Sequence, residues 1–439
     1  MKMNSMQKYP AYKNSGVEWL GEIPEHWEAV SLGSILELKS DKNHPDYEVL
    51  SVYREYGVIK KDSRDDNHNA TSLDTSNYKA VEPGDLVVNK MKAWQGSMGV
   101  SPHKGIVSPA YITCRVNSEK IHPEYLHRLL RCDLYIGEYN RLSYGVRVGQ
   151  WDMHYEDFKH ITTAIPPIHE QTAIANFLDN KTALIDKAIA LKEKQIELLK
   201  ERRQILIHRA VTRGLNPDVN LKDSGVEWIG EIPEHWEVVP MIKYTSRVDY
   251  RGKTPEKVDS GITLVTTKNI KGGIIDYEIS KEYVLEKDYN AIMSRGIPKI
   301  GDILFTMEAP LGMSAVVDNT DIAIAQRIIK FHFDEKVFDS FFVNYSIQSE
   351  YFQKILQREA TGSTAQGIKA SKLHKLKIVK PPIEEQNKIV SHIENISTKI
   401  STAITLKEKE IDKLKEYKSV LINEAVSGKI KVNFKKDLL

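Results

Sequence analysis

The most constraining feature of this sequence is that the chain repeats itself. Residues 15–28 read SGVEWLGEIPEHWE, and residues 224–237 differ from them only by Ile229 in place of Leu20. A second shared motif, Pro-Pro-Ile-x-Glu-Gln, begins at Pro166 and again at Pro381. Such self-similarity predicts a structural unit built twice. A partial duplication without functional meaning is the alternative.

The segments between the shared motifs are far less alike. Residues 30–165 and 238–380 fill the same place in the two halves, yet their sequences have little in common. A frame that is kept twice while its contents vary favours two different binding elements presented in equivalent poses.

A charged, periodic stretch after each Pro-Pro motif predicts a long helix. Apolar residues recur at heptad spacing over residues 171–212, and the same pattern returns 215 residues later. Lys192 and Lys407 interrupt both seams at the same heptad position, as polar residues that fix helix register do. Gly214 and Gly428 provide the expected stop signals. The predicted helix seam consists of Leu178, Ile185, Ile189, Ile196, Leu199, Leu206, Ile393, Ile400, Ile404, Ile411, Leu414 and Leu421.

The linker between the halves sets the direction of the second helix. A first helix of some 40 residues is about 60 Å long, and only residues 214–223 join its end to the second repeated opening. The second helix therefore has to run back along the first. We expect an α+β fold with two globular heads in a pseudo-two-fold arrangement, separated by two long antiparallel helices that form a coiled-coil spacer. Separate packing of each helix on its own domain is the alternative.

Several apolar runs within the heads predict strands, and two amphipathic segments predict helices. The runs after Gly84 and Gly301 follow glycine punctuation that is typical of strands entered from turns. The expected strands are 85–88, 302–305, 47–52, 111–116, 261–267 and 328–333, and the expected helices are 123–131 and 337–357.

Composition and motifs exclude several classes of function. The chain has 62 Lys and Arg against 60 Asp and Glu, a net charge of +2, and no apolar run long enough to span a bilayer. Cys114 and Cys132 form no Cys-x-x-Cys motif, which fits a reducing cytoplasm and argues against a disulfide framework or a thiolate metal site. Dinucleotide, P-loop, zincin, nucleophile-elbow and amino-methyltransferase motifs are absent. We therefore expect a cytoplasmic binding protein without catalytic residues, bound metal or membrane contact.

Segments that mix basic, amide and aromatic residues predict contact with double-stranded DNA. Such residues neutralise phosphates and read base edges, and two separated heads suit a long periodic ligand. Residues 181–213 add nine Lys and Arg against four Asp and Glu. Solvated charge and polar structural loops are the alternative interpretations. The candidate DNA-binding residues are Lys90, Lys92, Trp94, Gln95, Arg141, Tyr144, Arg147, Gln150, Arg251, Lys253, Lys268, Asn269, Gln326, Arg327, Ser363, Thr364 and Gln366.

The order of these motifs resembles the specificity subunit of type I restriction-modification systems. The paired openings at 15–27 and 224–236, the Pro-Pro-Ile-x-Glu-Gln helix starts, and the Gly-Asp-Leu/Ile segments at Gly84 and Gly301 carry the resemblance over essentially the whole chain. It implies two target-recognition domains that each read one half of an asymmetric, bipartite DNA site. The antiparallel helix pair would then set the unread gap.

The resemblance also implies partners and boundaries. Two DNA adenine methyltransferase (modification) subunits would dock on the helices, and restriction/translocase subunits would join for cleavage. S-adenosylmethionine, ATP and Mg are expected on those partners, with no cofactor in this chain. A coiled-coil interaction scaffold without sequence-specific DNA binding and a DNA-acting enzyme with an unrecognised site are the alternatives. The implied parts are target-recognition domain 1 (1–165), spacer helix 1 (166–214), target-recognition domain 2 (215–380), spacer helix 2 (381–430) and a C-terminal tail (431–439).

Overall fold

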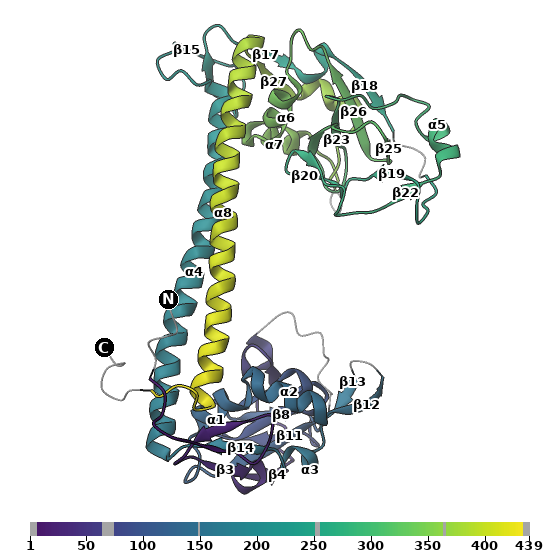
Figure 1. Cartoon of the computed structure of the whole chain (residues 1–439). Helices are drawn as coiled ribbons and strands as arrows, with labels where there is room; N and C mark the ends of the chain where they lie inside the picture. Colours follow the sequence, from purple (N-terminus) through teal and green to yellow (C-terminus); the bar gives the residue numbers. More distant parts are fainter. Residues whose placement is uncertain (1–6, 64–73, 148–149, 251–254, 363–365, 433–439) are drawn as a thin grey trace. The chain divides into compact units, whose positions relative to one another are not determined.

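The chain folds into two compact units that share two long helices. The computed structural model describes residues 7–63, 74–147, 150–250, 255–362 and 366–432, without the side chains of residues 146, 147 and 150. Unit 1 comprises Met1–Lys192 with Glu408–Leu439, and unit 2 comprises Glu193–Lys407. The helices α4 (Ile168–Arg213) and α8 (Ile383–Val426) each contribute one part to each unit (Figure 1).

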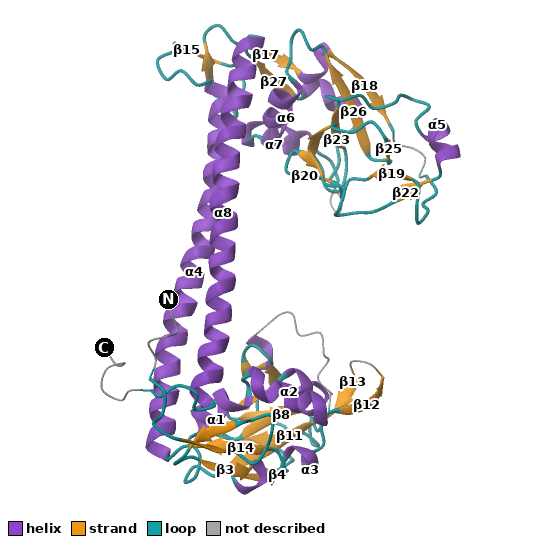
Figure 2. Ribbon diagram, in the orientation of Figure 1, coloured by secondary structure: helices purple, strands orange, loops and turns teal. Residues whose placement is uncertain are grey.

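Unit 1 is built on a four-stranded antiparallel sheet in the order β4 (Leu36–Lys39), β11 (Tyr111–Val116), β8 (Leu86–Asn89), β9 (Met98–Val100). Strands β4, β11 and β8 are labelled in Figure 2. Side chains alternate between the faces of a strand, so Leu86 and Val88 pack against helices α1 (Pro123–Leu130) and α2 (Asp133–Leu142). Val87 points to a smaller core on the other face. The remaining elements are the strand pairs β1 (Tyr12–Asn14) with β2 (Glu22–Pro24), β3 (Glu28–Ser31) with β14 (Thr162–Ile165), β5 (Leu50–Tyr53) with β6 (Gly57–Lys60), β7 (Lys79–Val81) with β10 (Gly105–Val107) and β12 (Tyr144–Arg147) with β13 (Gln150–Asp152), and the short helix α3 (Tyr155–Phe158).

Unit 2 repeats this sheet in the order β18 (Thr245–Asp249), β26 (Ile328–Phe333), β23 (Ile303–Thr306), β24 (Ser314–Val316). Its strand β23 also alternates, with Ile303 and Phe305 in the core that holds α6 (Ser340–Gln348) and α7 (Glu350–Glu359), and Leu304 in a second core. The prediction of mixed α and β halves with a long helix between them is confirmed. The remaining elements are β15 (Leu221–Asp223) with β16 (Glu231–Pro233), β17 (Glu237–Pro240) with β27 (Lys377–Lys380), β19 (Ile262–Val265) with β22 (Tyr283–Val284) and β25 (Ile322–Ile324), β20 (Ile270–Lys271) with β21 (Ile274–Ile275), and α5 (Tyr289–Ile292).

The two long helices pack antiparallel within each unit. In unit 1 the Nζ of Lys418 bonds both carboxylate oxygens of Asp186 at 2.7 Å. In unit 2 the Nε of Arg203 donates to the Oγ of Ser397 at 3.1 Å. Residues further along α4 therefore pair with residues nearer the start of α8. The helices run antiparallel, as expected from the short linker.

The apolar seam and its polar interruptions lie between these helices. Lys192 lies 2.5 Å from the carboxylate of Glu410, and Lys407 donates to the side-chain oxygen of Gln195 at 2.6 Å. These bonds hold the polar seam positions in one register. The residues predicted for the seam divide into a buried group, Leu178, Ile185, Ile196, Ile393, Ile400, Ile411 and Leu421, and a half-buried group, Ile189, Leu199, Leu206, Ile404 and Leu414.

A wholly buried glutamine joins the start of each long helix to the globular part of its unit. The side-chain oxygen of Gln386 accepts from the backbone N–H of Asp339 at 2.9 Å, and its amide donates to the carbonyls of Val337 and Pro381. Gln171 makes the corresponding three bonds in unit 1. The repeated Pro-Pro-Ile-x-Glu-Gln motif is therefore a joint between helix and domain.

The repeated openings pack against the other ends of the helices. Gly214 and Gly428 have φ angles of +72° and +74°, the left-handed conformation that glycine adopts after a helix. A Cβ at either position would come within 3.1 Å of the indole ring of Trp236 or Trp27, respectively. Both tryptophans are wholly buried. In each unit the duplicated opening therefore packs against the C-terminal end of a long helix.

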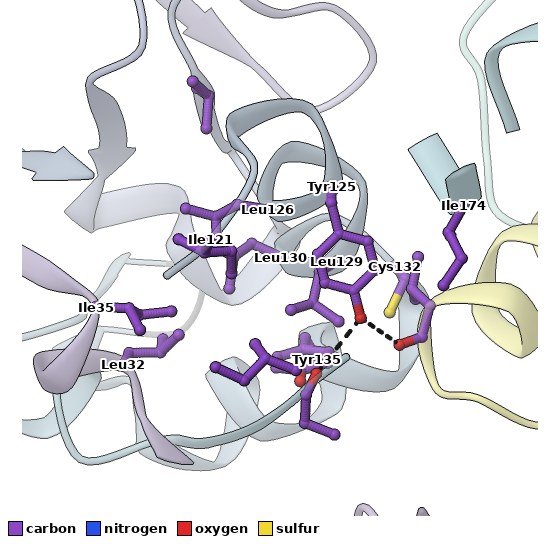
Figure 3. Close-up of a cluster of buried hydrophobic side chains, with 14 of the residues drawn as sticks. Leu32, Ile35, Ile121, Tyr125, Leu126, Leu129, Leu130, Cys132, Tyr135 and Ile174 are labelled. Carbon is purple, nitrogen blue, oxygen red and sulfur yellow. Dashed lines mark hydrogen bonds between the residues drawn. The ribbon is translucent and has the colours of Figure 1, made fainter. Parts of the chain in front are cut away.

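The core of unit 1 also includes the C-terminal end of α8. Figure 3 shows Tyr125 among apolar side chains of α1 and α2, with Ile174 of α4 beside them. The Tyr125 hydroxyl donates to the carbonyl of Val426 at 3.0 Å and contacts that of Ala164 at 3.4 Å. The bond to Val426 satisfies a carbonyl that a helix end leaves without a partner.

The structure corrects two sequence-based boundaries and adds one helix. The helix expected over residues 337–357 is broken at Ser349, whose extended backbone separates α6 from α7 and whose hydroxyl donates to the carbonyl of Ser346. The strand expected over residues 47–52 begins only at Leu50. Helix α2 follows α1 after a two-residue break and was not anticipated.

We predict that Gln386→Ala destabilises the protein by roughly 1–3 kcal/mol, the cost of leaving a buried hydrogen-bonding group without a partner. Urea unfolding followed by circular dichroism measures the change. The matched control is Asn387→Ala, because Asn387 is the next residue on α8 and is exposed. Equal stability of the two variants would contradict the assigned role of Gln386.

Candidate nucleic-acid interface

Two segments that are distant in the sequence meet at one end of the sheet in unit 1. The turn η4 (Lys90–Gln95) leaves strand β8, and the backbone N–H of Met153 donates to the carbonyl of Lys90 at 2.9 Å. The Nζ of Lys90 bonds Asp152 at 3.1 Å, and the ring of Trp94 meets Trp151 edge to face at 5.0 Å. The hairpin β12–β13 is thereby fixed beside η4, so the structure brings the predicted residues 90–95 and 141–150 together.

The predicted residues of this surface differ in their availability. Lys92 is exposed, and the Tyr144 ring, 57% exposed, stacks on His154 at 5.1 Å. Gln95 and Trp94 are half-buried, and the buried indole N–H of Trp94 has no partner within the described part of the chain. Arg141 is exposed but is held by two bonds to Glu138. Arg147 and Gln150 lie on β12 and β13, and their side chains are outside the described residues.

Unit 2 brings equivalent segments together after β23. The backbone N–H of Met307 donates to the carbonyl of Arg327 at 2.9 Å, and that of Ile368 donates to the carbonyl of Met307 at 3.1 Å. Glu308 and Gly367 form an isolated antiparallel bridge. The structure thus places the half-buried Gln326 and the exposed Arg327 and Gln366 at one end of the sheet, although these residues are far apart in the sequence.

An open pocket lies beside these residues in unit 2. Its polar lining consists of amide side chains, and the rest of its lining is apolar. The amide of Gln353 is occupied, because it donates to the carbonyls of Gly312 at 3.0 Å and Ile347 at 2.7 Å. The exposed amides of Gln357 and Gln366 can pair with the N6 and N7 edge of adenine, and apolar groups can contact the methyl of thymine. The lining residues are Ala309, Pro310, Leu311, Gln353, Leu356, Gln357 and Gln366. Gln357 was not identified from the sequence, because its helical segment predicts only packing.

Two predicted residues lie elsewhere in unit 2. Lys268 is exposed in the turn between β19 and β20, with its Nζ 3.8 Å from the carboxylate of Glu282. Asn269 is wholly buried; its side-chain oxygen accepts from Thr266, and its amide donates to two backbone carbonyls. This corrects the assignment of Asn269 to the interface, because its side chain stabilises a turn and has no surface to offer. The predicted residues Arg251, Lys253, Ser363 and Thr364 lie outside the described residues.

The two Gly-Asp segments noted in the sequence have a structural role. Asp302 is wholly buried, accepts from Lys330 at 2.6 Å and from the ring of His332 at 2.8 Å, and caps the backbone N–H of Lys299. Asp85 makes an ion pair with Lys39 at 2.6 Å in unit 1. Lys330 lies on β26, the neighbour of β23, whereas Lys39 lies on β4, which β11 separates from β8. In both units a lysine of the sheet therefore holds the aspartate of the turn that enters β8 or β23.

We predict that Asp302→Asn destabilises unit 2 by about 3–5 kcal/mol, because the buried Lys330 would lose its carboxylate partner. Thermal unfolding of the full chain measures the effect. The control Asp321→Asn removes an exposed carboxylate of the same unit and should change stability by about 0.5 kcal/mol or less. A change of similar size in both variants would exclude the buried pair as a stabilising element.

Other reactive groups in the described ranges are buried or dispersed. Burial raises the pKa of the Cys114 and Cys132 thiols to about 12, so both stay protonated at neutral pH and are poor nucleophiles. Among the described residues, no three His, Cys, Asp or Glu side chains are grouped so that they could hold a metal ion. No described helix is long and apolar enough to cross a membrane. The geometry of the two surfaces suits binding.

Comparison with known proteins gives a consistent family assignment. Residues 24–201 and 253–416 match the model of the type I restriction modification DNA specificity domain. The chain is 26% identical to the type I restriction enzyme MjaVIII specificity subunit of Methanocaldococcus jannaschii, over 93% of this chain and 94% of the relative. It is 25% identical to the EcoBI specificity subunit of Escherichia coli, over 53% and 50% of the two chains.

Solved structures share the fold at low sequence identity. A chain from a study of complex assembly and conformational transition of the type I R-M system superposes with a TM-score of 0.70 at 15% identity, covering 93% of this chain and 99% of its own length. The crystal structure of the HsdS subunit from Thermoanaerobacter tengcongensis gives a TM-score of 0.54 at 16% identity, covering 93% and 98%.

Proposed function

The chain belongs to the family of type I restriction-modification specificity subunits, and we propose that it is the non-catalytic subunit that selects the DNA sequence. Unit 1 reads one half of a bipartite site and unit 2 reads the other. The unread gap between the half-sites is set by the paired helices α4 and α8.

One observation carries this proposal: the two units build the same sheet but present different side chains at one end of it. Both have the same sheet order, and in both the segment that follows β8 or β23 is bonded to a segment distant in the sequence at the same sheet end. Unit 1 presents cationic and aromatic side chains there, such as Lys92 and Tyr144, whereas unit 2 presents Arg327 and amides such as Gln366. Because base edges are read by side-chain chemistry, sheet ends with different side chains read different half-sites, and the site is asymmetric.

The partners follow from the same proposal. Two modification subunits that methylate adenine with S-adenosylmethionine bind this chain, and restriction subunits that use ATP and Mg join for cleavage. Exposed apolar residues at seven-residue spacing on α4 support docking of partner helices. They are Leu184 and Leu191 in unit 1, and Leu198 and Ile205 in unit 2.

We predict that this chain, expressed together with a modification subunit, directs adenine methylation to a split, asymmetric motif. Sequencing of modified bases in the host DNA identifies the motif, and expression of either chain alone is the control. A motif that appears only with both chains supports the proposal. A motif that is independent of this chain would favour the alternative of an interaction scaffold.

We predict that inserting seven residues into both helices widens the gap by about three base pairs, because a heptad adds about 10 Å of helix and keeps the seam in phase. The insertions belong between Lys192 and Glu193 and between Lys407 and Glu408, where corresponding heptads meet. Seven Gly and Ser residues inserted after the exposed Pro217 are the control and should leave the gap unchanged. An unchanged gap in the helix variant would refute the role of the helices as a spacer.

A further inference from the structure

The backbone of Arg327 has a conformation that is unusual for its side chain. Its φ angle is +77°, and among the described residues only Asn43 shares a positive φ without being glycine. Asparagine tolerates this region, whereas residues with long side chains adopt it rarely. Backbone strain of this kind persists where the surroundings enforce it, and it is concentrated at functional sites.

The surroundings of Arg327 do enforce it. Ala325 and Ile328 are buried on either side, and the Arg327 carbonyl accepts from the backbone N–H of Met307 at 2.9 Å. The side chain itself is 52% exposed. Arg327 is therefore a solvent-facing guanidinium on an anchored backbone, at the sheet end where Gln326 and Gln366 also lie.

The guanidinium has a neighbour but no bound partner. Its Nε lies 4.0 Å from Oε2 of Glu308, beyond hydrogen-bond length, and it donates no hydrogen bond to any described residue. Glu308 is fixed by its bridge to Gly367, where an added Cβ would come within 3.0 Å of the Glu308 Cγ. The carboxylate orients the guanidinium electrostatically and leaves its donors free.

A carboxylate at this place argues against simple phosphate binding. Glu308 repels the DNA backbone, so a contact made only to phosphate would be weakened by it. An arginine fork that meets a base edge instead pairs bidentately with O6 and N7 of guanine. A fixed backbone and a neighbouring carboxylate provide the orientation that this pairing requires.

Unit 1 has a closed ion pair at the same sheet end, although at a different position. Lys90 follows β8 as Met307 follows β23, and its Nζ is bonded to Asp152 at 3.1 Å. That ion pair connects two segments of unit 1 and occupies the cation. The open Arg327–Glu308 pair is thus a distinguishing feature of the second unit.

We propose that Arg327 reads a guanine in the major groove of the half-site bound by unit 2, with Glu308 as its positioning residue. This inference rests on the proposed function and adds the identity of one base. It makes Arg327 a determinant of specificity at a single position, while the other half-site is independent of it.

The experiment replaces each guanine of the methylated motif in turn by 7-deazaguanine, which lacks the N7 acceptor, and measures DNA binding by fluorescence anisotropy. The full chain should lose affinity about 5-fold or more at one guanine of one half-site, the lower end of the range for a bidentate contact. Arg327→Ala should bind unmodified DNA about 5- to 150-fold more weakly and be insensitive to the replacement at that guanine.

The matched control is Lys336→Ala, which removes an exposed cation just beyond the opposite end of β26. It should keep the sensitivity of the original chain at that guanine, and melting temperatures verify that each variant is folded. The inference is overturned if the original chain is insensitive at every guanine, or if Arg327→Ala keeps its sensitivity. Failure of the original chain to bind the motif at all would refute the proposed function instead, and the inference with it.

A second variant tests the positioning role. Glu308→Gln keeps the shape of the side chain and removes its charge. It should reduce the 7-deazaguanine effect while strengthening binding to unrelated DNA, because phosphate repulsion is lost. If Glu308 had only a structural role, Glu308→Gln would change the affinity for the motif and the affinity for unrelated DNA in the same direction. Unchanged sensitivity to 7-deazaguanine would exclude Glu308 as a positioning residue.

Discussion

The hydrogen bonds of two buried glutamines are the constraint on which the rest of the structure depends. Gln171 and Gln386 tie the first turn of α4 and α8 to the globular part of units 1 and 2, respectively. Since each amide is wholly buried and bonded on both its oxygen and its nitrogen, the helix direction relative to its own domain is fixed. The duplicated motifs around these residues are therefore explained by architecture, and they leave the intervening segments free to differ.

The intervening segments form the same kind of sheet in both units but present chemically different side chains at its end. Strands β8 and β23 are covered on both faces, so their side chains pack in the apolar cores. Variation is tolerated where the strands end, and there the chain places cations and aromatic rings in unit 1 and an arginine with several amides in unit 2.

The sequence predicts those features that depend on periodicity and repetition. The long helices, their antiparallel pairing and strands β11 and β26 follow from local patterns, and the structure contains them. Features that depend on distant partners could not be derived. The sequence around Asn269 is that of a polar loop whether its side chain stabilises a turn or contacts a ligand. Lys330 meets Asp302 only in the folded sheet. The left-handed backbone of Arg327 has no sequence signature.

The division of the chain into units has a consequence for synthesis on the ribosome. Unit 2 is one continuous stretch, residues 193–407, whereas the core of unit 1 includes Leu421, Ala425 and Val426 from the last part of the chain. Unit 2 can thus complete its core before the residues of α8 that complete the core of unit 1 have been synthesised. The domain that emerges first is finished last, so the apolar side chains that α8 covers stay exposed during translation and need protection from aggregation.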